Sequence, residues 1–101
     1  MSERDFRRAK FNLTCDLKTK PSQIEKAISD IEALILQEAL CKKKAPKIVF
    51  EGFGTYSLDI SVTLFVSSKD FTKFQLVKQE INLGILKILE KEGIELASSV
   101  K

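Results

Sequence analysis

Hydrophobic and polar side chains alternate along residues 57–66. Every second position is apolar, and these positions are Leu58, Ile60, Val62, Leu64 and Val66. The positions between them carry Asp59, Ser61, Thr63 and Phe65. Because successive side chains of a strand leave opposite faces, this pattern predicts a strand with one dry face and one mostly wet face.

Three further segments have the character of strands. Residues 11–17 alternate, with Phe11, Leu13, Cys15 and Leu17 on the apolar side. Residues 47–51 are rich in β-forming residues, with Ile48 and Phe50 on the inner side. Residues 52–56 (GFGTY) predict a tight turn with positive φ at one or both glycines, so segments 47–51 and 57–66 should form a hairpin. Residues 94–96 are expected to begin a short last strand.

A helix is predicted over residues 21–40, and Pro46 prevents its continuation. Apolar residues recur at helical intervals, at Ile24, Ala27, Ile28, Ile31, Leu34 and Ile35. Pro21 suits a first helical turn, and Ser22 with Glu25 has the spacing of a capping box. The start of this helix is therefore expected at residues 20–22.

A second helix is predicted over residues 71–92. Its buried face should contain Phe71, Phe74, Val77, Ile81, Ile85 and Ile88. Asp70 or a nearby serine should cap its start, and Gly93 should end it in a left-handed conformation. Gly84 lies in mid-helix, where glycine costs about 1 kcal/mol relative to alanine, so close contact with the sheet or with the first helix is expected there.

The order strand, helix, strand, strand, helix, strand predicts an α+β fold of the ferredoxin-like split βαβ (βαββαβ) type, with two helices on one face of a four-stranded antiparallel sheet. Right-handed crossovers would place the first and third strands side by side in its centre, parallel to each other. We expect a charged N-terminal arm at residues 1–9, the domain at residues 10–97 and a C-terminal tail at residues 98–101.

Composition fits a single domain of 101 residues with 44% hydrophobic content. The chain has neither an apolar run of about 18 residues nor an N-terminal apolar stretch, so neither a membrane span nor a secretory signal is expected. The formal net charge is +3. Basic residues cluster at Arg4, Arg7, Arg8 and Lys10, and again at Lys42, Lys43, Lys44 and Lys47. Such clusters can dock phosphates or lipid head groups, but a solvated surface is the commoner meaning of a charge run.

No constellation of catalytic residues is found. Histidine is absent, and Cys15 and Cys41 follow no metal-binding spacing, so we expect no catalytic, cofactor-binding or metal site and no enzymatic activity. Asp16 and Asp59 are expected on the open face of the sheet, either as an acid–base pair or, more commonly, as two solvated carboxylates.

Nucleic acid is not an expected partner. The open face offers one aromatic side chain, Phe65, and two acidic ones, which makes a poor platform for stacked bases. Apolar groups outside the predicted core rows remain at Val49, Phe53, Tyr56 and Phe65, and together they form a candidate subunit interface. For Phe53 and Tyr56, covering the core from the hairpin is an equal alternative.

Several short motifs together resemble the C-terminal cytoplasmic α/β domain of the small-conductance mechanosensitive ion channel (MscS) family. They are the turn Gly52-Phe53-Gly54, the following Ser57-Leu58-Asp59, the pair Asp70-Phe71, the stretch Glu80-Ile81-Asn82-Leu83, and Gly93-Ile94-Glu95. Arg7-Arg8 before a strand and Pro21 before an Ile/Glu-rich helix also fit the family. The resemblance covers residues 7 to 96.

The resemblance implies a fragment of a cell-membrane channel. In the intact channel this domain would lie on the cytoplasmic side, as a soluble wall element of a hollow cage built from several copies of the same subunit, and would touch the membrane only through upstream segments. It would contribute to subunit assembly and to the path of ions and solutes. The alternatives are a free-standing ferredoxin-like binding or regulatory module and, less favoured, an enzyme.

Overall fold

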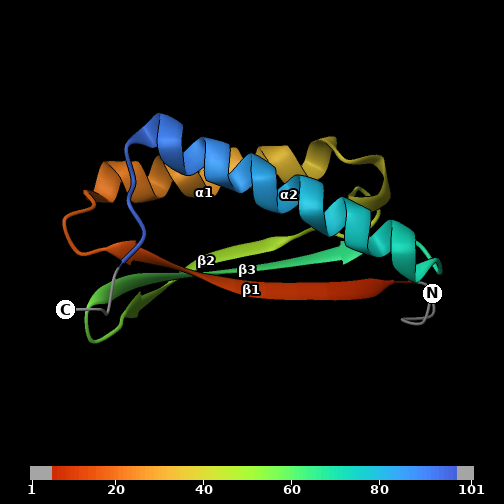
Figure 1. The fold of residues 1–101 in the computed structure, drawn as a ribbon, viewed down its shortest axis with the longest axis horizontal. Coiled ribbons are helices and arrows are strands. Elements are labelled where there is room, and N and C mark those ends of the chain that lie inside the picture. Colours follow the sequence, from red (N-terminus) through yellow and green to blue (C-terminus); the bar gives the residue numbers. More distant parts are fainter. Residues whose placement is uncertain (1–5, 98–101) are drawn as a thin grey trace.

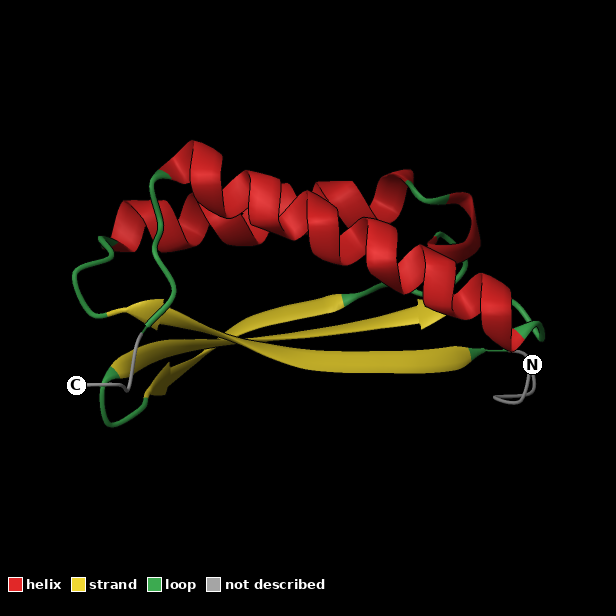
Figure 2. Ribbon diagram, in the orientation of Figure 1, coloured by secondary structure: helices red, strands yellow, loops and turns green. Residues whose placement is uncertain are grey.

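Two helices lie on the same face of a three-stranded sheet in the computed structural model, which describes residues 6–97 (Figures 1 and 2). In chain order the elements are β1 (Arg7–Asp16), α1 (Pro21–Gln37), the short 3-10 helix η2 (Ala39–Cys41), β2 (Lys47–Phe53), β3 (Ser57–Val66) and α2 (Phe71–Glu92). β1 begins at Arg7, four residues before the strand predicted from the alternation. Residues 1–5 of the predicted arm and the predicted tail at residues 98–101 lie outside the described residues, so the division into arm, domain and tail stays a prediction.

The strand order is β1-β3-β2, and both pairings are antiparallel. The predicted pairing of β1 with β3 is confirmed, with Phe11 opposite Val62 and Cys15 opposite Leu58. The expectation that these two strands run parallel is wrong. The β2–β3 hairpin reverses the chain, so β3 runs against β2, and β1 pairs with β3 in the same antiparallel sense.

The predicted fourth strand is reduced to one bridge, between Cys15 and Leu96. Two hydrogen bonds accompany it: Asp16 N donates to Glu95 O at 2.8 Å, and Ala97 N donates to Thr14 O at 2.7 Å. Ile94 turns into the core instead of pairing with β1. Within residues 6–97 the sheet therefore has three strands rather than four, and β1 lies at its edge rather than in its centre.

The core lies between the sheet and the helices. It contains the whole apolar row of β3 and, on the helices, the buried residues Ile24, Ala27, Ile31, Ile35, Phe74, Val77, Ile81, Ile85 and Leu89. Ile28, Leu34 and Ile88 pack against it while partly buried. Three residues predicted in the core are exposed: Leu17 and Phe71 are each about half exposed, and Phe50, on the edge strand β2, is 38% exposed. Leu17 follows the end of β1, and Phe71 is the first residue of α2. Each therefore lies at the end of an element, where the core does not cover its side chain.

The helix starts are only partly as predicted. Lys20, not Ser22, is the N-cap of α1, and its backbone N–H donates to Gln23 Oε1 at 2.8 Å. Pro21 occupies the first turn as expected. Asp70 caps α2 as predicted, because its Oδ1 accepts from the backbone N–H of Thr72 at 2.9 Å. Gly93 ends α2 with φ of 72°, which confirms the left-handed C-cap.

The β2–β3 hairpin is confirmed, and it contains an irregularity that the alternation did not predict. The register shifts between Phe50, which faces Ile60, and Gly52, which faces Asp59. Gly52 has φ of +141°, so the predicted positive φ falls on this glycine and not on Gly54. Such a β-bulge adds one residue to one strand, so side chains beyond it change face.

No helix among residues 6–97 combines the length and the apolar character needed to cross a membrane.

Candidate functional site

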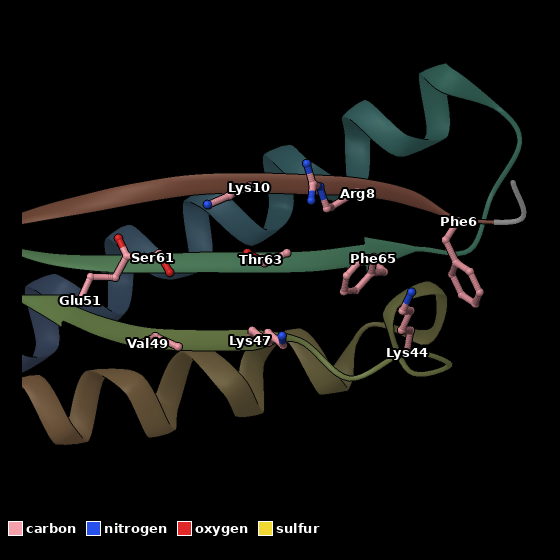
Figure 3. A pocket seen from close by; sticks show the side chains of 10 residues that line it. All are labelled: Phe6, Arg8, Lys10, Lys44, Lys47, Val49, Glu51, Ser61, Thr63 and Phe65. Atoms are coloured by element: carbon pink, nitrogen blue, oxygen red, sulfur yellow. The ribbon is translucent and has the colours of Figure 1, made fainter. Parts of the chain in front are cut away.

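The face of the sheet opposite the helices carries a shallow hollow of about 550 Å³ (Figure 3). Side chains from all three strands line it, together with two residues outside them. These are Arg8 and Lys10 of β1, Lys47, Val49 and Glu51 of β2, Ser61, Thr63 and Phe65 of β3, and the flanking Phe6 and Lys44.

Basic side chains dominate this hollow. Lys10, Thr63 and Lys47 occupy one row across the sheet, since Thr63 pairs with Lys10 on one side and with Lys47 on the other. Arg8 pairs with Phe65 in the neighbouring row. The Lys44 ammonium lies 4.4 Å from the centre of the Phe65 ring and 5.7 Å from that of Phe6, a cation–π arrangement that holds its charge at the rim.

Arg7 belongs to the same basic run in the sequence but lies on the other face. Its guanidinium lies 5.3 Å from the ring centre of Phe71 and 5.9 Å from that of Phe74. Its Nη2 donates to Lys69 O at 3.2 Å. Arg7 therefore ties β1 to the start of α2, and the strand alternation separates it from Arg8.

The four residues of the predicted subunit interface do not form one patch. Val49 and Phe65 line the hollow on the open face. Phe53 pairs with Leu58 of the core row, so the bulge places it on the helix side, where its ring packs edge-on against Phe50 at 5.8 Å. Tyr56 lies in the hairpin turn.

Phe53 and Tyr56 do not cover the core, which was the alternative role for them. Their side chains are 78% and 57% exposed. Phe53 instead lines an apolar notch of about 380 Å³ between the hairpin and the start of α1. The notch also includes Leu17, Pro21, Ile24, Ile28, Phe50 and Leu58. Sequence reasoning missed this notch, because it assigned Leu17 and Phe50 to the core.

A third exposed apolar feature lies on α2. Leu76, Leu83 and Leu86 are each about half exposed, and Leu76 and Leu83 line a shallow depression along the outer side of this helix. Their spacing of seven and three residues, about two turns and one turn, places them along one side of the helix. The sequence contains this spacing, but the longer apolar row that forms the core of the same helix drew attention away from it.

The motif Gly52–Asp59 has a local structural role at the hairpin. Gly54 N donates to Ser57 O at 2.8 Å, and Ser57 Oγ donates to Asp59 Oδ1 at 2.7 Å. A Cβ atom on Gly54 would lie 2.5 Å from Ser57 Oγ. Gly54 is therefore needed for space and Gly52 for its backbone conformation, while Leu58 is buried in the core.

The two carboxylates considered as an acid–base pair are both engaged locally. Asp16 Oδ1 accepts from Lys18 N at 2.9 Å, while Asp59 is held by Ser57. Their strand partners, Ser57 and Thr14, place them on a diagonal rather than directly opposite each other. Neither lines the basic hollow or the apolar notch.

Both cysteines are buried free thiols. Burial raises the pKa of Cys15, and the Asp59 carboxylate adds to that shift. Burial, with a contribution from Glu38, raises the pKa of Cys41 to about 11. Both groups are therefore protonated and unreactive at neutral pH. Among residues 6–97 no three His, Cys, Asp or Glu side chains gather as a metal site would require.

Comparison with known proteins identifies the family. The model for the family "Mechanosensitive ion channel MscS, C-terminal" matches residues 9–96. This chain therefore belongs to the MscS family of mechanosensitive ion channels and corresponds to its C-terminal domain, as the sequence motifs had indicated.

Two curated relatives agree with this assignment. An MscS family protein of Aquifex aeolicus is 28% identical over 97 residues, which cover 95% of this chain and 26% of the relative. The small-conductance mechanosensitive channel MscMJ of Methanocaldococcus jannaschii is 30% identical over 97 residues, or 96% of this chain and 27% of that protein. The chain thus spans about a quarter of the length of these relatives. MscMJ is named as a channel and not as an enzyme.

Solved structures share the fold. Arabidopsis thaliana MSL1, determined by cryo-electron microscopy, superposes with a TM-score of 0.82 at 14% identity, over 94% of this chain and 35% of that one. The crystal structure of Helicobacter pylori MscS in a closed state gives a TM-score of 0.71 at 19% identity, over 96% of this chain and 37% of that one.

Proposed function

We propose that this domain is a wall element of a cage on the cytoplasmic side of a mechanosensitive channel in the cell membrane. It contributes to contacts between copies of the same subunit and to the path of ions and solutes, and it carries out no catalysis. The observation that carries this proposal is the family match over residues 9–96, which covers nearly the whole domain.

The exposed apolar features supply candidate contacts between copies. A head-to-tail ring needs two different patches on each subunit. The notch with Phe53, together with Tyr56 of the same hairpin, is one, and the Leu76–Leu83–Leu86 side of α2 is the other. The two patches lie on different elements and are therefore distinct surfaces, as a heterologous contact requires. Val49 and Phe65 belong to the open face instead and are not part of either patch.

A chimaeric channel tests this proposal. The segment of MscMJ that aligns with this chain is deleted in one version and replaced by this chain in another, and currents are recorded from membrane patches under suction. We expect the deletion to remove most active channels and the chimaera to restore them. A deletion that matches the intact channel in number of active channels and in conductance would contradict the assembly role.

Point variants in the chimaera test the two patches. Phe53→Ser and Leu83→Ser should each reduce the number of active channels, because each removes apolar area from a contact. Leu36→Ser is the matched control, since Leu36 on α1 is 40% exposed and belongs to neither patch. Equal losses in all three variants would show that lost stability, and not lost contact, is responsible.

A further inference from the structure

Two basic clusters that are far apart in the sequence meet on the open face of the sheet. Arg8 and Lys10 come from the first, and Lys44 and Lys47 from the second (Figure 3). Among residues 6–97, the only carboxylate in the lining is Glu51. The chain has 17 basic and 14 acidic residues, so removing these four and this one leaves 13 of each. The described lining of the hollow thus carries a formal charge of +3, which equals the formal net charge of the chain.

Three of these cations are not neutralised within the part of the chain that the structure describes. The ion pairs among residues 6–97 lie on the two helices, where Lys26 contacts Glu92 and Lys91 contacts both Asp30 and Glu92. Arg8, Lys10 and Lys47 take part in none of them. Lys10 and Lys47 lie on the two strands that flank β3, and their like charges on one face of the sheet repel each other across Thr63. A bound anion would remove that repulsion.

The row Lys10–Thr63–Lys47 gives the hollow a defined centre. Neighbouring strands lie about 4.8 Å apart, so the Cα atoms of the two lysines lie about 10 Å apart with Thr63 between them. Two flexible ammonium groups can therefore reach an anion placed above the Thr63 hydroxyl. Arg8 adds a planar fork of donors from the next row, which suits a phosphate group.

We propose that this hollow binds a small, soluble anion that carries a phosphate group. A phosphate monoester has a charge of about −1.5 to −2 at pH 7 and three acceptor oxygens, which matches a site with several cations and a hydroxyl. The volume of about 550 Å³ suits a small solute.

Two other phosphate-bearing partners fit the hollow less well. The cations surround a concave surface, whereas a flat membrane would favour protruding basic side chains. Stacked bases are disfavoured because the Lys44 ammonium lies over the Phe65 ring. The proposal does not depend on the channel-wall role.

Binding is tested by NMR titration of the 101-residue chain with inorganic phosphate at low ionic strength, following the backbone amide signals. Sodium chloride at matched ionic strength is the control. We expect saturable shifts at Lys10, Lys47 and Thr63 with phosphate and not with chloride. Shifts that rise linearly without saturation, or that map to the helices, would overturn the proposal.

Charge variants distinguish specific phosphate binding in the hollow from non-specific attraction of phosphate to a positively charged protein. Lys10→Gln combined with Lys47→Gln should weaken phosphate binding about tenfold, since it removes two charge-assisted contacts. Lys73→Gln combined with Lys87→Gln removes the same charge from the exposed side of α2 and should weaken it less than about twofold. Equal weakening by both pairs would overturn the proposal. Binding to vesicles of phosphatidylglycerol without saturable binding of phosphate would do so too, by assigning the face to a membrane.

Discussion

Gly84 of α2 lies directly against Leu34 of α1. A Cβ atom on Gly84 would approach Leu34 Cδ2 to 2.7 Å and Cδ1 to 2.8 Å. The absence of a side chain therefore lets the Leu34 side chain pack against the backbone of α2. This contact with the first helix is one of the two that the sequence predicted for a glycine in mid-helix, and it offsets the low helix propensity of glycine.

We expect the effect of Gly84→Ala to change sign with the residue at position 34. In the natural chain Gly84→Ala should destabilise by about 1 kcal/mol, because overpacking outweighs the gain in helix propensity. In a Leu34→Ala background the clash is gone, and the same change should stabilise by about 1 kcal/mol. Urea unfolding of the four proteins measures the coupling. Equal effects of Gly84→Ala in both backgrounds would show that the two residues do not interact.

Gln23 connects the start of α1 with the end of α2. Its Oε1 accepts from Lys20 N at 2.8 Å, and its Nε2 donates to Glu92 O at 2.7 Å. Gln23→Ala removes both bonds and should lower the free energy of unfolding by about 1–2 kcal/mol.

A second substitution separates the contributions of the two Gln23 hydrogen bonds to stability. Gln23→Glu keeps the acceptor for Lys20 but places a carboxylate against the carbonyl of Glu92, so it should restore only part of the loss. Gln79→Ala, at an exposed position of α2, is the control and should change stability by less than about 0.5 kcal/mol. Full recovery by Gln23→Glu would mean that the bond to Glu92 contributes nothing.

Hydrophobic periodicity predicted both helices and β3 because these elements bury a regular row of side chains, and the turn residues 52–56 predicted the hairpin. It could not predict the β-bulge at Gly52, which depends on backbone geometry rather than on polarity. Without the bulge, simple alternation would place Phe53 on the open face with Val49. The extra residue turns Phe53 to the helix side, and the predicted interface is divided for that reason.

The basic hollow shows a different limit of sequence reasoning. Both lysine and arginine clusters were visible, but their joining depends on β3 lying between β1 and β2 with one particular register. The face of each residue matters as well: Arg7 contacts Phe71 and Phe74 on the helix side, while Arg8 lines the hollow. Net charge alone, at +3, gave no indication that the excess is concentrated in one place.

Cys41 should make the stability of the domain depend on alkaline pH. Its pKa is about 11 in the folded chain, against 9.0 for an unperturbed thiol, because burial disfavours the thiolate. The folded chain favours the neutral thiol, and this preference contributes fully to the free energy of unfolding below pH 9. The contribution is lost as pH rises from about 9 to 11.

Comparison with Cys41→Ala isolates this contribution. Other groups that titrate above pH 9 are present in both proteins, so their effects cancel in the difference. The difference in unfolding free energy between the natural chain and Cys41→Ala should shrink steadily above pH 9, as measured by urea unfolding at several pH values. A difference that stays constant up to pH 11 would show that the Cys41 thiol ionises alike in the folded and unfolded chain.

The isolated 101-residue chain should be monomeric or only weakly associated in dilute solution. Its two proposed contact patches, the notch with Phe53 and the leucine side of α2, are made of few and partly exposed side chains. Stable association usually buries about 1,200–2,000 Å² in total, and a ring in the full channel would be held together by other parts of each subunit as well. Light scattering at micromolar concentration should therefore give a mass near 11.4 kDa. A stable ring under these conditions would show that this domain alone contains enough contact area for assembly.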